Sequence, residues 1–175
     1  TSKTFAWGRG LETHEFWRLI SVDRRTGEFT YLFSGASRFD RFFGAPELIS
    51  TLKEEPEHIL AGHVSNHGQY SIYKVNLADG KEKIVTRGDR ADGGFKEKFA
   101  GTVDWVVDAD GAPAVRVDYY TDDEQRRFYK PDSEGGWTLA SALPEKEADE
   151  QQAVVYSLAE APNLVYAKMI VDGYR

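Results

Sequence analysis

Residues 70–85 read YSIYKVNLADGKEKIV, and this stretch decides the fold class. The run 70–77 is rich in β-branched and aromatic side chains, and residues 81–85 form a second, shorter run. Residues 78–80 between them, Ala-Asp-Gly, are typical of a tight turn. Two strand-forming runs around a short loop that contains glycine predict a β-hairpin.

The same hairpin pattern occurs twice more along the chain. Residues 16–33 hold one copy, and residues 126–140 hold the other. The turn glycines of the three copies, taken as Gly27, Gly80 and Gly136, are 53 and 56 positions apart. The hairpin is therefore predicted to belong to a repeating unit.

A second marker repeats out of phase with the hairpins. Pro56, Pro113 and Pro162 each lie in a short polar turn that an apolar strand follows, and they are 57 and 49 positions apart. A further strand is expected before each of these turns. The unit thus has about 50 residues and four short strands, which is typical of one blade of a β-propeller.

We predict an all-β chain that forms a partial β-propeller of about three to three and a half four-stranded blades. No sustained helical periodicity supports a helical solenoid, and residues 145–152 are either a short acidic helix or a solvated loop. Closed propellers have about four to eight blades, so this count is too low for the chain to close alone. The predicted boundaries are a partial blade at 1–46, blades at 47–101 and 102–147, and a partial blade at 148–175.

Three stretches resemble blades from the propeller of prolyl oligopeptidase-like serine peptidases, the group with dipeptidyl and acylaminoacyl peptidases. They are YKVNLADGK at 73–81, ISVDRRTGE at 20–28, and VDWVVDADGAP at 103–113 with RVD at 116–118. The resemblance covers most of the chain. It implies a non-catalytic propeller that gates the access of a peptide substrate to a C-terminal α/β-hydrolase domain carrying Ser, Asp and His. The parent protein would then be a serine peptidase.

Two other functions stay open. The blades could serve as a stand-alone platform for binding proteins or peptides, without a linked enzyme. A small enzyme could also use paired carboxylates, for example Asp118 with Asp122. Fold resemblance alone does not decide between these functions.

Composition excludes several classes of protein. The chain of 175 residues has 22 basic and 29 acidic residues, and a net charge of −7 argues against a nucleic-acid partner. No apolar run approaches the roughly 20 residues of a membrane span. Cysteine is absent, which removes disulfides and thiolate chemistry. The opening residues TSKTFAWGRG lack the pattern of a signal peptide, and the cytoplasm and the periplasm both remain open.

No catalytic residue is predicted in this chain. The nucleophile elbow of an α/β-hydrolase reads G-x-S-x-G, and the nearest stretch, GASRF at 35–39, has Phe39 in place of the last glycine. A nucleophilic Ser37 is therefore disfavoured. We expect the chain alone to be inactive as a peptidase.

No metal site and no cofactor are predicted. The four histidines, His14, His58, His63 and His67, are expected to be exposed on turns and strands. The acidic residues Asp108, Asp110, Asp118 and those at 122–124 could offer oxygen ligands to calcium, but their spacing is not that of a calcium loop. Turns and a solvated face are the favoured interpretation for these carboxylates.

The aromatic residues have two interpretations. Trp7, Trp17, Trp105 and Trp137 occur close to once per blade and are expected to fill the space between neighbouring sheets.

A cluster of phenylalanines, Phe39, Phe42 and Phe43, surrounds two arginines at 38 and 41. Core packing is favoured for this cluster as well. Arg38, Arg41 and Phe42 are nevertheless the candidate substrate-binding residues, because an arginine on a loop can pair with a peptide carboxylate.

Self-association is also expected. A partial propeller leaves open blade faces, and it leaves strand edges at 4–8 and 164–170. Two copies of about three and a half blades would make a ring of about seven. We therefore predict a homodimer or another form of self-association. The alternative is a monomer whose terminal strands fold back to cover the open faces.

Overall fold

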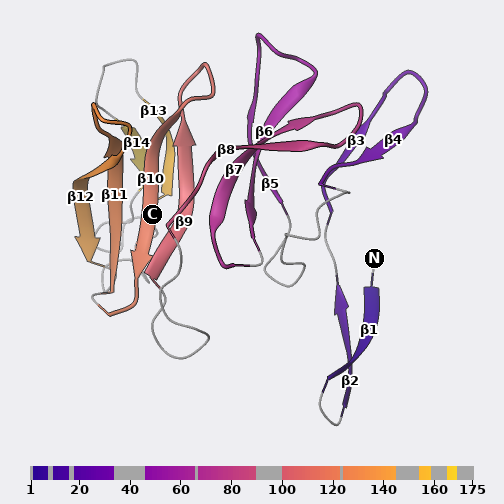
Figure 1. Ribbon diagram of the computed structural model, residues 1–175, viewed down its shortest axis with the longest axis horizontal. Coiled ribbons are helices and arrows are strands. Elements are labelled where there is room, and N and C mark those ends of the chain that lie inside the picture. The colour runs from indigo at the N-terminus through magenta and orange to yellow at the C-terminus, as the bar shows by residue number, and fades with distance from the viewer. Residues whose placement is uncertain are drawn as a thin grey trace.

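The computed structural model describes residues 2–7, 10–15, 18–33, 46–65, 67–89, 100–122, 124–144, 154–158 and 165–168. Side chains are described for residues 18–33, 46–65, 67–89, 101–122 and 124–143. All regular structure in these ranges is β-strand and turn (Figure 1). The predicted acidic connector at 145–152 lies outside them. The prediction of an all-β chain with four-stranded antiparallel units is confirmed for the described part.

The first four-stranded sheet is an antiparallel meander, in the order β5-β6-β7-β8. Its strands are β5 (Glu47–Thr51), β6 (His58–Val64), β7 (Tyr70–Asn76) and β8 (Glu82–Thr86). All five central residues of β6 are buried. Burial at successive positions means that both faces of this sheet are covered, because neighbouring side chains on a strand point to opposite faces.

The second sheet repeats this meander, in the order β9-β10-β11-β12. Its strands are β9 (Ala100–Val107), β10 (Pro113–Tyr120), β11 (Gln125–Pro131) and β12 (Trp137–Pro144). The predicted blade boundary after residue 101 falls inside β9, because Ala100 and Gly101 already pair with Tyr120 and Tyr119.

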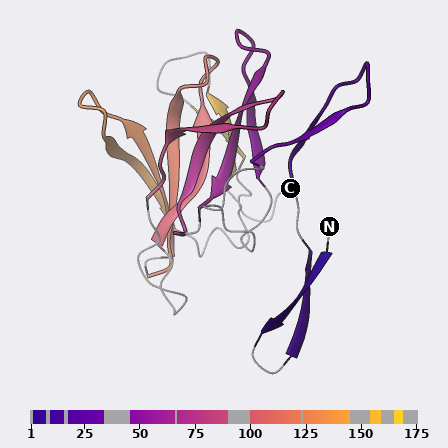
Figure 2. The same cartoon turned by 45° about the vertical axis from the view of Figure 1, so that its right-hand side comes forward.

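Three hairpins complete the described structure: β1 (Ser2–Trp7) with β2 (Gly10–Glu15), β3 (Ile20–Val22) with β4 (Phe29–Tyr31), and β13 (Val154–Leu158) with β14 (Val165–Lys168). Residues 1–46 were predicted as one partial blade, but their described strands form two separate two-stranded sheets. Figure 2 shows the β1–β2 hairpin well apart from β3–β4. Leu32 and Phe33, just after β4, pack on the β5–β8 sheet instead.

Side-chain oxygens close the hairpin turns. Asn76 Oδ1 accepts hydrogen bonds from the backbone N–H groups of Ala78 (2.8 Å) and Asp79 (3.2 Å). The aspartates that accept backbone N–H bonds in the same way, in three other turns, are Asp23, Asp108 and Asp132. Such turns explain the strong local hairpin signal in the sequence.

The third hairpin requires one correction. Its glycine with positive φ, equivalent to Gly27 (φ 75°) and Gly80 (φ 70°), is Gly135 (φ 81°) and not Gly136. The turn after Asp132 is one residue shorter, since the Asp132 N–H donates to the carbonyl four residues on, whereas the Asn76 N–H donates to the carbonyl five residues on. The corrected spacings are 53 and 55 positions.

The strand ladders show the same repeat. The first strand of each unit carries one extra residue opposite its neighbour: Ile49 on β5, Val103 on β9 and Tyr156 on β13. These bulges are 54 and 53 positions apart. Because bulges are specific local features of a strand, their recurrence makes β5, β9 and β13 equivalent strands.

The prolines follow the repeat less closely. Pro56 lies in the turn two residues before β6, and Pro113 is the first residue of β10. Both thus occur at the entry to a second strand, where a missing N–H is tolerated. Pro162 lies outside the described residues.

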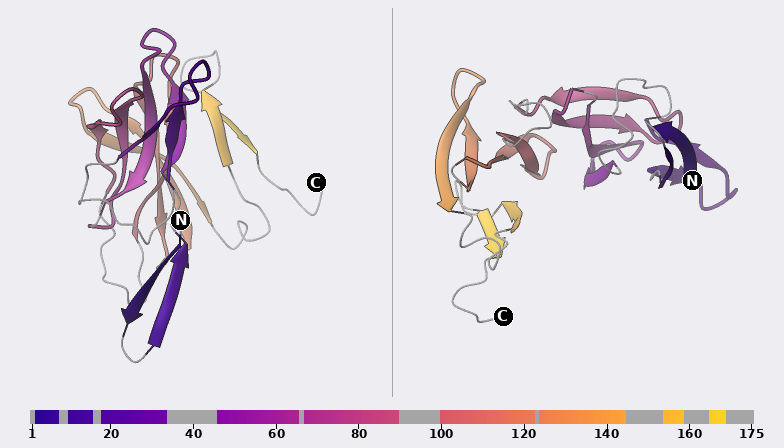
Figure 3. Two further views of the ribbon diagram at one scale, coloured as in Figure 1. Left: turned by 90° about the vertical axis from the view of Figure 1, so that its right-hand side faces the viewer. Right: turned by 90° about the horizontal axis from the view of Figure 1, so that it is seen from below.

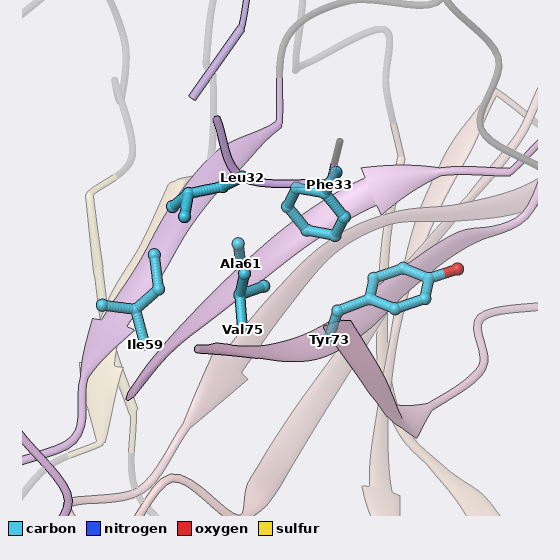
Figure 4. Packing of buried hydrophobic residues seen from close by; sticks show 6 residues of the cluster. All are labelled: Leu32, Phe33, Ile59, Ala61, Tyr73 and Val75. Atoms are coloured by element: carbon cyan, nitrogen blue, oxygen red, sulfur yellow. The ribbon is translucent and has the colours of Figure 1, made fainter. Parts of the chain in front are cut away.

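Apolar layers join the units. Leu32 and Phe33 pack against the β6 and β7 side chains Ile59, Ala61, Tyr73 and Val75 (Figure 4). On the opposite face of this sheet, Leu52, Leu60 and Ile72 pack against Trp105 of β9.

The second sheet has its own apolar face. Val106, Val115 and Val117 form a cluster there with Phe128. Trp105 and the half-buried Trp137 meet edge to face on the other side, with ring centroids 5.3 Å apart, so the predicted packing role is confirmed for both. The side chains of Trp7 and Trp17 are not among those described.

The units follow one another in chain order along a bent row, as the view from below in Figure 3 shows. β9 contacts both β5 and β7 of the preceding sheet, and it contacts β13, the first strand of the following hairpin. None of the described sheets closes on itself.

Substitutions at two turn glycines distinguish the cost of placing a side chain at positive φ from the cost of a steric clash. Gly27 and Gly80 both have positive φ, but a Cβ at Gly27 would meet no atom within 4 Å, whereas at Gly80 it would lie 2.2 Å from the Tyr31 carbonyl oxygen. We expect Gly27→Ala to cost about 1 kcal/mol of unfolding free energy, from conformation alone. Gly80→Ala should cost about 3 kcal/mol, since backbone must also shift. Urea denaturation measures both, and equal costs would contradict the docking of the Gly80 turn on β4.

Candidate functional site

The predicted substrate-binding residues Arg38, Arg41 and Phe42 lie outside the described residues. So do Ser37 and the neighbouring phenylalanines at 39 and 43. Their assignment stays a prediction from the sequence. The described chain instead concentrates its polar chemistry at two places between the β5–β8 and β9–β12 sheets.

The first place is the sheet seam, which we define as Ser71, Gly88, Asp89, Thr102, Arg116 and Asp118. Residues 87–89 leave β8 and enter the space between the two sheets. The Gly88 N–H donates to Ser71 Oγ (3.3 Å), and the Asp89 N–H donates to Thr102 Oγ1 (2.8 Å). These hydroxyls satisfy backbone groups that would otherwise be buried without a partner.

Position 88 accepts only glycine, because atoms of Tyr70 and Thr102 leave no room for a side chain. A Cβ on Gly88 would lie 2.2 Å from the Tyr70 carbonyl oxygen and 2.7 Å from Thr102 Cβ. No larger side chain fits unless the connecting segment moves away from both sheets.

Arg116 holds two carboxylates in the sheet seam. Its Nη2 lies 2.9 Å from Asp89 Oδ2 and 2.9 Å from Asp118 Oδ2, and its guanidinium stacks 4.6 Å from the centre of the Tyr129 ring. Thr102 Oγ1 donates to Asp118 Oδ1 at 2.7 Å. Burial raises the pKa of Asp118, while the Thr102 hydroxyl and the Arg116 charge lower it in part.

The position of Asp118 differs from the one expected from the sequence. A solvated face was expected, but Asp118 is 0% exposed. Arg116 and Asp118 are two positions apart on β10, so they share one face of the strand and form an ion pair there. A carboxylate that is closed off from solvent and held by Thr102 and Arg116 does not serve as a base with Asp122, which is exposed in the turn after β10.

The second place is an acidic pair, Glu47 on β5 and Asp104 on β9. Tyr70 Oη donates to Glu47 Oε2 at 3.0 Å. The Tyr70 ring reaches Glu47 by crossing β6 at Gly62, where a Cβ would lie 2.1 Å from that hydroxyl oxygen. The Trp105 indole N–H donates to the Tyr70 carbonyl (3.1 Å) and ties the two sheets together.

Burial and the nearby Glu47 charge favour the protonated forms of Tyr70 and Asp104. Burial and the nearby Glu47 charge raise the pKa of Tyr70 well above its ordinary value, so the hydroxyl remains a donor. Burial also raises the pKa of Asp104, the N–H of Trp105 opposes this rise, and the Glu47 charge adds to it. The arrangement is a hydrogen-bonded acidic patch at the first strands, without a nucleophile beside it among the described side chains.

Glu55, Glu57 and His58 form the group that could hold a metal among the described residues, with ligand atoms within 4.8 Å of one another. His58 Nδ1 lies 3.6 Å from Glu55 Oε2 and 3.5 Å from Glu57 Oε1. Lys74, however, already forms an ion pair with Glu55.

The tautomer of His58 also opposes a metal ion at this group. The turn fixes Asn76 Oδ1, so Asn76 Nδ2 faces His58 Nε2 at 3.4 Å. Nε2 therefore accepts a hydrogen bond and the ring proton sits on Nδ1, where a metal would have to bind. The Lys74–Glu55 ion pair and the Asn76–His58 hydrogen bond therefore account for this group better than metal binding does.

The remaining histidines differ in exposure. His67 is exposed in a turn, as predicted, and the side chain of His14 is not among those described. The prediction is wrong for His63, which is buried with its ring against the edge of Phe33. His63 lies on β6, and both faces of that strand are covered.

The Asp108 turn bears on the calcium alternative. Asp108 Oδ1 accepts the N–H groups of Asp110 (3.0 Å) and Ala112 (2.8 Å). The Asp108 carboxylate thus stabilises the β9–β10 turn, which supports a structural role in the turn for this residue.

The sequence reasoning missed Asp89 and Thr102, as well as Glu47, Tyr70 and Asp104. One local signal was present in Val115-Arg116-Val117-Asp118, where two opposite charges alternate with two valines. In a strand with both faces covered, this pattern indicates a buried ion pair. The residues that join these sites from other parts of the chain gave no such signal, because strand register and sheet packing bring them together.

Comparison with protein-family models, with curated proteins and with solved structures finds no match for this chain. In the described part of the chain, no helix is long and apolar enough to cross a membrane.

Two aspartate substitutions test the sheet seam. Asp118→Ala leaves Arg116 buried without its nearest strand partner, and we expect it to cost about 3 kcal/mol of unfolding free energy. Asp89→Ala removes the other carboxylate, but Asp89 is exposed, so we expect a cost below about 1 kcal/mol. Urea denaturation at neutral pH compares the two variants. A larger cost for Asp89→Ala would show that the buried pair does not hold the seam.

Proposed function

We propose that the chain is a segment of a β-propeller, in which four-stranded sheets stand around a central axis with their first strands innermost. It works as a non-catalytic wall that gates the access of peptides to an α/β-hydrolase domain of a prolyl oligopeptidase-like serine peptidase. The observation that carries the propeller proposal is the proximity of β9 to both β5 and β13, the first strands of the units before and after it. A propeller brings together the innermost strands of successive blades in this way.

Two further features support this arrangement. Each first strand is bulged at an equivalent position, and bulges favour the strong local twist of propeller-like sheets. The layers between units consist of aromatic and aliphatic side chains from consecutive sheets, as at Trp105 with Leu60 and Ile72. Such layers pack one sheet onto the next without any backbone pairing between them.

The gating role is supported by the sequence resemblance and by the chemistry of the described residues. Several of their carboxylates, among them Glu55, Asp108 and Asp118, are held in turns or ion pairs. No helix follows a strand to present a nucleophilic serine in the described part of the chain. In this proposal the segment selects and admits peptides, and the reaction takes place in the hydrolase domain. Arg38, Arg41 and Phe42 would contact the peptide.

A peptide-binding assay tests this function. We expect the purified chain to hydrolyse no chromogenic peptide, yet to bind short peptides that carry a free C-terminal carboxylate, measured by isothermal titration. Arg41→Ala should weaken binding about tenfold, which corresponds to the loss of one charge-assisted hydrogen bond. Arg24→Ala, a change in the exposed β3–β4 turn, is the matched control and should leave affinity unchanged.

Two results would contradict the proposal. One is hydrolysis by the chain that Ser37→Ala abolishes, since it would place the nucleophile here. The other is absence of binding by any peptide of this class.

A further inference from the structure

The two four-stranded sheets turn equivalent faces toward the part of the chain that precedes each of them. Counted from the bulges of β5 and β9, Ala61 and Asp118 hold the same position on the second strand, and so do Ile59 and Arg116. We define the leading face of the first sheet by Ile59 and Ala61, and that of the second sheet by Arg116 and Asp118.

The leading face of the first sheet is apolar. Ile59 and Ala61 are both buried, and they pack in one cluster with Leu32 and Phe33 from the segment just after β4. The junction between this sheet and the preceding segment is thus an apolar contact.

The second sheet buries charges at the same two positions. Arg116 and Asp118 are both buried, and they form an ion pair. Beside them, Trp105 packs against Leu60 and Ile72 of the first sheet. The second junction therefore combines apolar packing with a charged pair, where the first junction has an isoleucine and an alanine.

Strength of packing does not explain this difference. A buried ion pair is often no more stabilising than apolar side chains of similar volume, because both charges must leave water. The first junction, moreover, packs well with aliphatic side chains at the two positions. The charges call for a role beyond holding the sheets together.

The segment just after β8 supplies the partners that the buried pair needs. Arg116 Nη2 donates to Asp89 Oδ2 at 2.9 Å. The Asp89 N–H donates to Thr102 Oγ1, and the Thr102 hydroxyl donates to Asp118. Gly88 brings this segment between the sheets, where a Cβ would clash with Tyr70 and Thr102. The leading face of the second sheet is thus matched to this one segment.

The segment just after β4 could not take its place. It offers Leu32 and Phe33, and a second sheet stacked there would bury Arg116 and Asp118 against apolar side chains. An ion pair that loses its hydrogen-bond partners on burial is strongly destabilising.

We propose that the Arg116–Asp118 pair determines the order in which the sheets stack, because it allows the second sheet to pack only on the first. Apolar layers alone select no partner, since hydrophobic contact is non-directional. The charged pair excludes the wrong junction through the cost of unpaired buried charges. This role goes beyond peptide gating, and it stands whether or not the chain binds a peptide.

Replacement of the pair by apolar side chains of similar combined volume tests this role. The variant combines Arg116→Met with Asp118→Leu. Its reporter is the indole N–H signal of Trp105 in a proton–nitrogen NMR spectrum, identified by Trp105→Phe. This N–H donates to the Tyr70 carbonyl of the first sheet at 3.1 Å, so its signal depends on how the sheets stack.

We expect one sharp Trp105 signal in the wild type and multiple or exchange-broadened signals in the double variant. The urea midpoint of the double variant should equal or exceed that of the wild type. Asp118→Ala alone, by contrast, should lower the midpoint, because it leaves Arg116 without its buried partner.

Glu55→Leu combined with Lys74→Met is the matched control. It removes another ion pair outside the sheet seam and preserves the net charge, so it should keep a single Trp105 signal.

Two results would overturn the proposal. One is a single sharp Trp105 signal in the Arg116→Met, Asp118→Leu chain, since the sheets would then find one arrangement without the charges. The other is a urea midpoint as low as that of Asp118→Ala, since the pair would then be required for stability itself. Peptide titration of the same variant reports separately on the proposed function.

Discussion

The structure depends on one constraint: the β5–β8 sheet is apolar on both of its faces. β6 cannot expose either side, since Ile59 and Ala61 face one layer while Leu60 faces the other. A sheet of this kind needs a neighbour on each side to remove both faces from water. The stacking of units in chain order and the apolar layers between them follow from that requirement.

Stacking the sheets buries the connection from β8 to β9, and the residues of the sheet seam hydrogen-bond to its backbone. The chain must pass from β8 to β9 between two apolar layers, and the backbone there still needs hydrogen-bond partners. Ser71 and Thr102 supply them, and the Thr102 hydroxyl in turn donates a hydrogen bond to Asp118. The Arg116 ion pair then compensates the buried carboxylate. The polar residues between the sheets thus serve the connection between β8 and β9.

Local chemistry explains which parts of the fold the sequence could predict. The hairpins at Gly27 and Gly80 were predictable, because Asx turns and strand-forming runs lie within a few residues of each other. The third turn was misplaced by one residue, since Gly135 and Gly136 are equally suited by composition and only the hydrogen bonds distinguish them. The bulges that relate β5, β9 and β13 leave no composition signal at all.

Tertiary contacts account for what the sequence could not show. Asp118 and His63 are buried because residues distant in the sequence pack on them, such as Thr102 on Asp118 and Phe33 on His63. Leu32 and Phe33 pack on the next sheet, a contact that composition does not reveal. The candidate peptide contacts Arg38, Arg41 and Phe42 lie beyond the described residues, so they rest on the sequence alone.

The adjacency of first strands from successive sheets is the central claim, and the absence of cysteine makes it directly testable. Leu48 on β5 and Val103 on β9 are both exposed, as is Leu139 on the far strand β12. With a short bifunctional thiol reagent, Leu48→Cys combined with Val103→Cys should give an efficient cross-link within one chain. Leu48→Cys combined with Leu139→Cys should give none. A cross-link to position 139 without one to position 103 would contradict the arrangement of the sheets.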